Sequence, residues 1–289
     1  MKNLLMILAA AALALGAKVS VAAPAATVEG VQMPAWVERG ATRLPLAPGM
    51  ELKGGDELKT GIGARLYVKL SEGSLLQLGE NATLRLQDLA PERDGLFKAT
   101  LNALEGALRF TTDALAKNRR RDVNITIRTV TAGIRGTDLW GKSTEERQIV
   151  CLIEGRIEVG AQGEPAVIMD QPQQFYQRVQ GKTLPVGRVD DAQLARWAKE
   201  TAIEKGRGAA RRGGKWKVTL ATAETQDAAL RVYDEVRAAG FAATILPVKT
   251  GDRSAYHVRI VQLPSQADAE ALVAQLRGKY GVAEPKISG

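Results

Sequence analysis

Residues 36–160 carry a repeated alternation of apolar and polar positions. Within this part, Leu66, Val68 and Leu70 stand at every second position and therefore share one face of a predicted strand. The same period of two recurs over residues 74–86, 124–129 and 147–159, with glycine, aspartate and serine between the pieces. Short strands separated by such turns predict an all-β domain, built as a sandwich, a barrel or a β-helix-like stack.

The pattern changes to a helical period after residue 189. Over residues 190–205, Leu194, Trp197 and Ile203 fall on one side of a predicted amphipathic helix, and two aspartates stand at its N-terminal end. The next stretch, GRGAARRGG at 206–214, has almost no apolar content. It predicts a flexible, basic linker.

Residues 215–289 alternate between strand and helix patterns in two related halves. Gly240 suits the end of the first helix, and Ser265 suits the N-cap of the second. The order strand, helix, strand, strand, helix, strand predicts an antiparallel sheet with both helices on one face. Strands are expected at 215–221, 242–248, 255–261 and 285–287, and helices at 225–240 and 265–281.

Alternation also divides the side chains of this small sheet between two faces. The helices are expected to cover Trp216, Val218, Leu220, Tyr256, Val258 and Ile260, which makes both aromatic rings core residues. The other face is expected to carry Lys217, Thr219, Ala221, His257, Arg259 and Val261. Hydroxyl, imidazole and guanidinium groups on that face can bond sugar hydroxyls, acetamido carbonyls and carboxylates.

The first residues have the order of a secretory signal peptide. Lys2 provides a positive start, residues 4–15 form an apolar run, and small residues fill 20–26. The run is shorter than the about 20 residues that span a bilayer. Cleavage between Ala22 and Ala26 is expected to release the mature chain into the periplasm without an integral membrane segment; an uncleaved anchor is the alternative.

Charge and cysteine content narrow the function classes. The formal net charge is +8, and residues 24–189, 190–214 and 215–289 each hold a surplus of two positive charges. This even spread is unlike the one-sided basic footprint of a nucleic-acid binder. Arg119, Arg120 and Arg121 form a short basic run that is expected in a solvated loop. The single cysteine, Cys151, lies in an apolar strand and is predicted to be a buried thiol.

The octet GTDLWGKS, residues 136–143, fits the spacing of a phosphate-binding loop. Such a loop needs a strand before it, a helix after it and a flexible interior whose N–H groups converge on phosphate. The interior here is Thr-Asp-Leu-Trp, and only five residues separate Ser143 from the next strand. We therefore predict no nucleotide site. Residues 138–142 are expected to form a strand, with Lys142 as a solvated residue at its end.

The β-rich part contains an ordered set of residues in which Gly-Asp and Glu-Gly-Ser sequences close hairpins between alternating strands. The set consists of Leu52, Gly55, Asp56, Leu58, Thr60, Gly61, Leu66, Val68, Leu70, Glu72, Gly73, Ser74, Leu76, Leu78, Asn81, Leu104, Gly106, Leu108, Val130, Thr131, Ala132, Arg135, Gly136, Thr137, Glu154, Gly155, Ile157 and Val159. With these residues, the β-rich part resembles the FecR domain family. The family implies an extracytoplasmic β domain, often in sensing proteins, with no catalytic residues to carry over.

The last 75 residues contain an aromatic-x-Val-x-aliphatic strand that begins at Trp216, a second that begins at Tyr256, and an alanine-rich helix after each. On these features they resemble the SPOR domain, a βαββαβ module that binds peptidoglycan. It implies recognition of glycan strands that have lost their stem peptides and that accumulate where division septa are split. The candidate peptidoglycan-binding residues are Lys217, Thr219, Thr222, His257 and Arg259.

Together these patterns predict a non-enzymatic periplasmic protein with two binding modules. The SPOR-like domain (215–289) is expected to bind peptidoglycan, with the division septum as its location, and the FecR-like domain (26–188) to bind a ligand or an envelope protein. A signal peptide (1–25) precedes them, and a helix with a basic linker (189–214) joins them. One histidine and one cysteine exclude ordinary zinc clusters and Cys-His catalysis, so no catalytic, metal, nucleotide or cofactor site is predicted. A FecR-type sensor or regulator and a glycan-cleaving enzyme with two convergent carboxylates are the alternatives.

Overall fold

The computed structural model describes residues 24–91, 96–112, 120–134, 136–250 and 253–289. Most of the predicted signal peptide lies outside these ranges, as do Arg119 and Arg135. None of the helices in these ranges has the length and apolar character that a membrane span needs.

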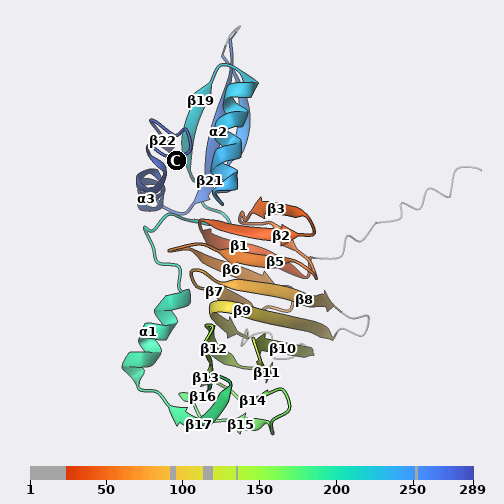
Figure 1. Ribbon diagram of the computed structural model, residues 1–289. Coiled ribbons are helices and arrows are strands. Elements are labelled where there is room, and N and C mark those ends of the chain that lie inside the picture. The colour runs from red at the N-terminus through yellow and green to blue at the C-terminus, as the bar shows by residue number, and fades with distance from the viewer. Residues whose placement is uncertain (1–23, 92–95, 113–119, 135, 251–252) are drawn as a thin grey trace, which may run out of the picture.

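Strands β1 to β18 form one hydrogen-bonded 18-stranded sheet, and its two parts pack face to face as an elongated sandwich (Figure 1). We call these parts the first and the second sheet. The first sheet has the spatial order β18 (Ala209–Arg211), β1 (Ala26–Gln32), β6 (Arg65–Leu70), β7 (Leu75–Leu78), β9 (Phe97–Thr111), β12 (Asp138–Ser143), β13 (Arg147–Glu154), β16 (Gln174–Val179) and β17 (Lys182–Arg188), and β4 (Glu51–Leu52) also pairs with β1. The second sheet has the order β3 (Thr42–Pro45), β2 (Ala35–Arg39), β5 (Glu57–Thr60), β8 (Thr83–Pro91), β9, β10 (Arg121–Ile127), β11 (Val130–Ile134), β14 (Ile157–Ala161) and β15 (Val167–Met169).

The long strand β9 belongs to both sheets. Its first part pairs with β8 and, in parallel, with β10 of the second sheet. From Gly106 onward it pairs with β7 and β12 of the first sheet. The chain therefore crosses between the sheets without a loop at this point, which joins the two halves of the sandwich by one continuous backbone.

The inner faces of the two sheets share one apolar core, as the alternation predicts. Gly141 on β12 marks a place where the sheets approach closely, because a Cβ atom there would lie 2.2 Å from Cδ1 of Ile127 on β10. Of the predicted β architectures, the structure has the sandwich. The largest fully buried apolar side chains of the strands include Phe110, Leu58, Leu66, Leu70, Leu76, Leu78 and Leu84.

The helix α1 (Asp191–Thr201) lies on the outer face of the first sheet. Asp190 caps its N-terminus, since the Asp190 carboxylate accepts a hydrogen bond of 2.7 Å from the amide of Gln193. Trp197 and Leu194 pack on a small apolar cluster of the sheet that contains Trp140 and Cys151. The predicted helix is thus confirmed, although it ends at Thr201 rather than at residue 205.

The predicted flexible linker at 206–214 contains a strand, so the sequence-based interpretation is wrong for that segment. Ala209, Ala210 and Arg211 form β18 and pair with Gln32, Val31 and Gly30 of β1. Both alanines are buried. The small side chains of Ala209 and Ala210 fit into this buried edge. No local pattern predicts the strand, because it forms through pairing with β1, which is distant in sequence.

Residues 215–289 form a four-stranded antiparallel sheet with two helices, in the predicted order. The strand order in space is β20 (Thr244–Thr250), β21 (Arg253–Leu263), β19 (Trp216–Ala223) and β22 (Lys286–Ser288). The helices α2 (Gln226–Ala238) and α3 (Gln266–Leu276) begin after Thr225 and Ser265, whose hydroxyls accept from backbone amides three residues on. The N-cap prediction for Ser265 is confirmed.

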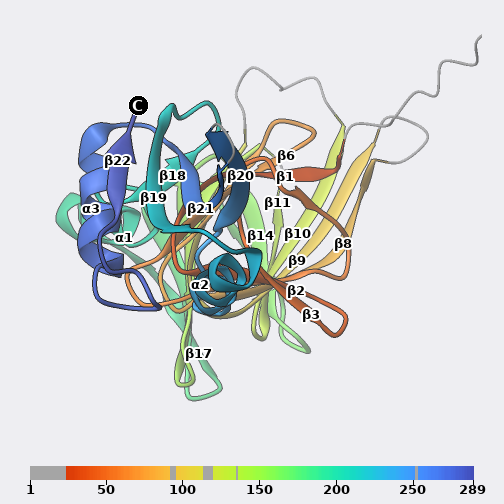
Figure 2. The ribbon, with the colours of Figure 1, turned by 90° about the horizontal axis from the view of Figure 1, so that it is seen from above.

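The small sheet and its helices lie against one end of the sandwich (Figures 1 and 2), and α2 contacts β3 there. The amide of Ala35 donates to the carbonyl oxygen of Gly240 (3.1 Å). Asp268, which is 2% exposed, accepts hydrogen bonds from the amides of Gly206 (2.9 Å) and Gly208 (3.2 Å). The segment between α1 and β19 is therefore held to α3 as well as to β1.

Candidate functional site

The sheet of residues 215–289 has one face covered by α2 and α3 and one face free of helices. Val218, Leu220, Val258 and Ile260 are almost fully buried on the covered side, in one core with residues of both helices. Trp216 and Tyr256 also pack against this core, as expected. The opposite side, which we name the open face, carries the polar residues of the same strands.

Strand pairing brings four polar residues into one row across the open face. Thr219 pairs with Arg259 of β21 and with Lys286 of β22. Arg259 pairs in turn with Thr244 of β20. Directly paired residues of antiparallel strands project from the same face. The row therefore reads Lys286, Thr219, Arg259 and Thr244.

A second row lies one step further along the strands and depends on a β-bulge. Thr222 pairs with His257, and His257 pairs with Leu246. The pairing shifts between Thr219 and Ala221, and Ala221 packs against the core on the helix side. The prediction that Ala221 faces outward is wrong, because the bulge inserts one residue and reverses the alternation beyond it. The same shift places Thr222 on the open face beside His257.

The five candidate residues therefore share the open face. Lys217 completes the set, since it pairs with Ser288 of β22 and lies two positions from Thr219. Thr222 is exposed, and the other four candidates are half-buried. Sequence reasoning missed Lys286, Thr244 and Ser288. The short strand expected at 285–287 was the available signal for Lys286, because a strand beside β19 must place alternate residues on this face.

The open face is cationic and rich in hydrogen-bond donors. Lys217, Arg259 and Lys286 supply three positive charges, and the paired rows contain no carboxylate. Nε of Arg259 is buried and has no hydrogen-bond partner among the described residues. A buried donor left unpaired costs about 1–3 kcal/mol. A ligand oxygen that reached this atom would remove the penalty, so the face suits an extended ligand with hydroxyl and carboxylate groups.

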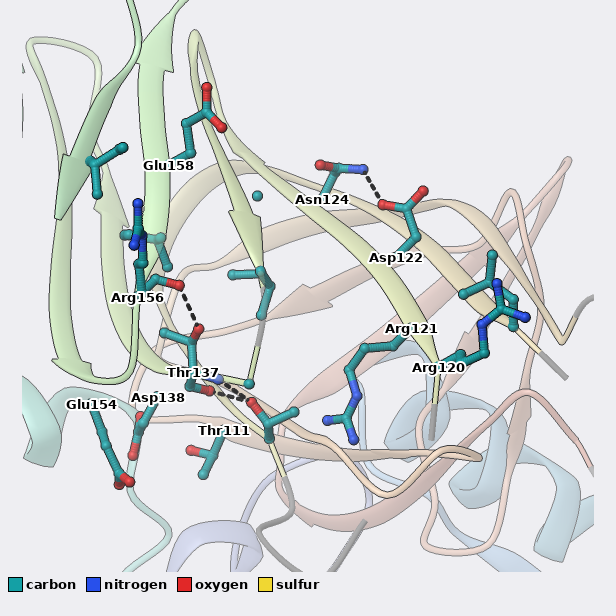
Figure 3. Close-up of a pocket in the computed structure, with 17 residues that line it drawn as sticks. Thr111, Arg120, Arg121, Asp122, Asn124, Thr137, Asp138, Glu154, Arg156 and Glu158 are labelled. Atoms are coloured by element: carbon teal, nitrogen blue, oxygen red, sulfur yellow. Dashed lines mark hydrogen bonds between the residues drawn. The ribbon is translucent and has the colours of Figure 1, made fainter. Parts of the chain in front are cut away.

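A separate cleft of about 1250 Å³ opens in the sandwich where strands of both sheets end (Figure 3). Beside it, the Thr112 hydroxyl donates to the carbonyl oxygen of Thr137 and accepts from the amide of Thr137, both at 2.5 Å. Asp138 is held by two hydrogen bonds from Arg109 (2.6 and 2.9 Å). The charged side chains that line the cleft have both signs: Arg120, Arg121, Arg156, Asp122, Asp138, Glu154 and Glu158.

The octet that fits the phosphate-loop spacing is largely strand. Residues 138–143 form β12, which is hydrogen bonded to β9 on one side and to β13 on the other. Its backbone amides therefore take part in strand pairing and do not converge on a phosphate site. Gly141 allows the close approach to Ile127. The sequence predicts Lys142 as a solvated residue, but its ammonium group forms an ion pair with the Glu200 carboxylate of α1 at 2.8 Å. Helix packing over β12, which no local pattern shows, supplies this partner.

Comparison with known protein families agrees with both resemblances. Residues 56–158 match the family described as FecR protein, and residues 212–284 match the family described as SPOR domain. The chain contains a FecR domain and a SPOR domain. SPOR domains indicate peptidoglycan binding, and FecR domains indicate a regulatory, sensing role. Both are binding or regulatory domains typical of envelope and periplasmic proteins.

The solved structures that match include two crystal structures of a candidate anti-sigma factor from Parabacteroides distasonis. The first has 13% sequence identity and a TM-score of 0.41, and the alignment covers 68% of this chain and 96% of the other. The second has 15% identity and a TM-score of 0.41, with 76% and 91% covered. No curated protein matches the sequence.

Proposed function

We propose that the open face binds peptidoglycan glycan strands that have lost their stem peptides. The observation that carries the proposal is the row Lys286, Thr219, Arg259 and Thr244, which joins four strands into one polar surface without a carboxylate. The neighbouring Lys217, Thr222 and His257 extend this surface along β19 and β21. The proposal keeps the predicted division of the chain into a signal peptide (1–25), a FecR-like domain (26–188), a helix with a linker (189–214) and a SPOR-like domain (215–289). It also includes export to the periplasm and accumulation at the division septum.

The chemistry of the glycan supports selectivity for stripped strands. An amidase that removes a stem peptide hydrolyses the amide on the lactyl group and leaves a free carboxylate on the muramic acid. Cations on the open face can pair with that carboxylate, and Arg259 can do so with two parallel hydrogen bonds. A stem peptide converts that carboxylate into an amide and holds the glycan strand away from the sheet. Both effects favour the stripped glycan.

A sedimentation assay with purified sacculi tests the proposal. The chain from residue 24 onward should bind sacculi, and treatment of the sacculi with an amidase should increase the bound fraction. The double variant His257→Ala, Arg259→Ala should show a much smaller increase, while Arg231→Ala, Arg237→Ala on α2, away from the open face, should keep it. An amidase-independent signal, or equal binding by both variants, would contradict the proposal.

The FecR domain is proposed to act as the ligand or partner module of the protein. The cleft in Figure 3 favours this role, because side chains of both charges line one concave site. A ligand bound there would reach the strand ends of both sheets at once. We propose no enzymatic activity; a clear zone in a murein-containing gel would favour instead the alternative of a glycan-cleaving enzyme.

A further inference from the structure

The helix α1 covers only part of the outer face of the first sheet and leaves a groove of about 710 Å³ beside it. Ile149 and Gln177 pair on β13 and β16, and Lys142 pairs with Ile149 from β12, so these three residues form a row along the groove. Trp197 of α1 and Phe175 of β16 also line it, with ring centroids 6.2 Å apart in an edge-to-face contact. The volume lies within the range of about 300–1,000 Å³ that is usual for small-ligand sites.

Three arginines border this groove without an ion-pair partner among the described residues: Arg147, Arg188 and Arg196. Arg188 donates one hydrogen bond, to the carbonyl oxygen of Pro172. Arg196 donates one to the side-chain oxygen of Gln193. A guanidinium group has five N–H donors, so most donors of all three side chains remain available.

The acidic groups of the groove do not balance these charges. Glu200, which lies next to the groove, is paired with Lys142 at 2.8 Å. Asp190 is engaged as the N-cap of α1. Glu146 is exposed, and within the described part of the chain its carboxylate forms neither a helix cap nor an ion pair. The groove therefore combines a surplus of positive charge with two partly exposed aromatic rings.

The backbone beneath the groove has no hydrogen-bonding edge to offer. β13 pairs with β12 and β16, and β16 pairs with β13 and β17. An extended peptide binds a sheet through an unpaired edge strand, and the floor of the groove has none. A ligand must therefore bond the guanidinium and amide side chains with its own substituents and place an apolar surface against the rings.

We propose that this groove binds an anionic sugar. Its carboxylate meets the guanidinium groups of Arg147 and Arg196, and an apolar face of the pyranose ring lies against Trp197 and Phe175. Gln177 and Gln193 provide amide groups for the sugar hydroxyls. The site lies in the β sandwich, separate from the open face of the SPOR domain, and does not depend on the function proposed for that face.

The test is a calorimetric titration of the chain from residue 24 onward that carries His257→Ala and Arg259→Ala, so that the open face contributes least. The probe is the disaccharide of N-acetylglucosamine and N-acetylmuramic acid without stem peptide. Saturable binding is expected, and Arg147→Glu with Arg196→Glu should weaken it about 10-fold or more. Lys199→Glu is the matched control, because Lys199 is an exposed residue of α1 outside the groove and should leave binding unchanged.

Three outcomes would overturn the proposal. Neutral chitobiose could bind as tightly as the acidic disaccharide, the arginine reversals could leave the affinity unchanged, or a glutamate-rich peptide could bind while the disaccharide does not. Arg147 is exposed, so Arg147→Glu alone provides a second variant that leaves the core intact. Sedimentation with amidase-treated sacculi tests the open face separately, because the groove variant keeps Thr219, His257 and Arg259 and should retain most of that binding.

Discussion

The indole rings of Trp140 and Trp197 stack with their centroids 4.5 Å apart and their planes 5° from parallel. Trp140 lies fully buried on β12, and Trp197 comes from α1, which begins after the last strand of the hairpin β16–β17. This pair attaches the helix to the outer face of the first sheet. Of the two rings, Trp197 also lines the groove in which we propose a sugar site.

Replacement of Trp197 by alanine should loosen α1 from the sheet. The change removes the stacking contact and uncovers Trp140, so the free energy of unfolding should fall by about 3 kcal/mol. Urea denaturation followed by circular dichroism measures this. Lys199→Ala on the exposed side of the same helix should change it by less than about 0.5 kcal/mol. Equal effects of the two substitutions would show that the stack does not hold the helix.

Gly240 is expected to be required for close packing of the SPOR domain against the sandwich. Its φ is +90°, and a Cβ atom would lie 2.6 Å from the Trp36 ring. Gly240→Ala should therefore cause both backbone strain and a steric clash. Strain alone lowers the free energy of unfolding by about 1 kcal/mol, so the total loss should be larger than this. Gly213→Ala is the matched control, because Gly213 has a φ of +80° and open space around it.

Scanning calorimetry and limited proteolysis measure the effect of Gly240→Ala. Gly240→Ala should lower the melting temperature more than Gly213→Ala and should expose the segment between α1 and β19 to cleavage. Two variants with the same melting temperature would mean that the Trp36 contact gives way without cost.

Cys151 should be unreactive in the folded protein. Burial raises the pKa of its thiol from about 9.0 to about 12, so the folded chain holds the proton more tightly than the unfolded chain. The corresponding stability is fully present below about pH 9 and is lost as the pH rises toward 12. Ellman's reagent at pH 8 should label the thiol only after denaturation. Rapid labelling of the native protein would place Cys151 at the surface.

The same thiol gives a stability test. Between about pH 9 and pH 11, wild-type protein should lose more unfolding free energy than Cys151→Ala, since the variant lacks the titrating group. Parallel loss in both proteins would assign the pH dependence to other residues.

Lys286 should contribute to glycan binding although it lies far in sequence from the other residues of its row. Lys286→Glu places a carboxylate beside Thr219 and near Arg259, where it repels the ligand and competes for the guanidinium group. The fraction bound to amidase-treated sacculi should fall several-fold at low salt. Lys279→Glu, an exposed change after α3, should leave the fraction unchanged. Equal binding by both variants would remove β22 from the site.

Local patterns in the sequence were sufficient for most individual elements. Alternation predicts the strands around Leu66 and Ile125, and Gly240 and the cap at Ser265 mark the end of one SPOR-domain helix and the start of the other, because these signals depend on neighbours within a few residues. The faces of β19 and β21 were also predictable as far as Thr219.

The remaining features depend on pairings between distant parts of the chain. The bulge that turns Ala221 inward arises from the register with β21, and β18 becomes a strand only beside β1. The ion pair of Lys142 with Glu200 forms because α1 returns over β12. The groove and the cleft both collect residues from several strands, so no single stretch of sequence carries their pattern.

The strand β18 makes one edge of the sandwich depend on a segment that is distant from it in sequence. Residues 209–211 cover the edge of β1. In the sequence they follow α1, which begins near β17, at the other end of the sandwich (Figure 1). A fragment cut at residue 188 would leave Gly30, Val31 and Gln32 as an open edge, a template for association between copies. We therefore expect that a soluble fragment of the FecR half has to extend beyond the family boundary at residue 158 and to end after Arg211.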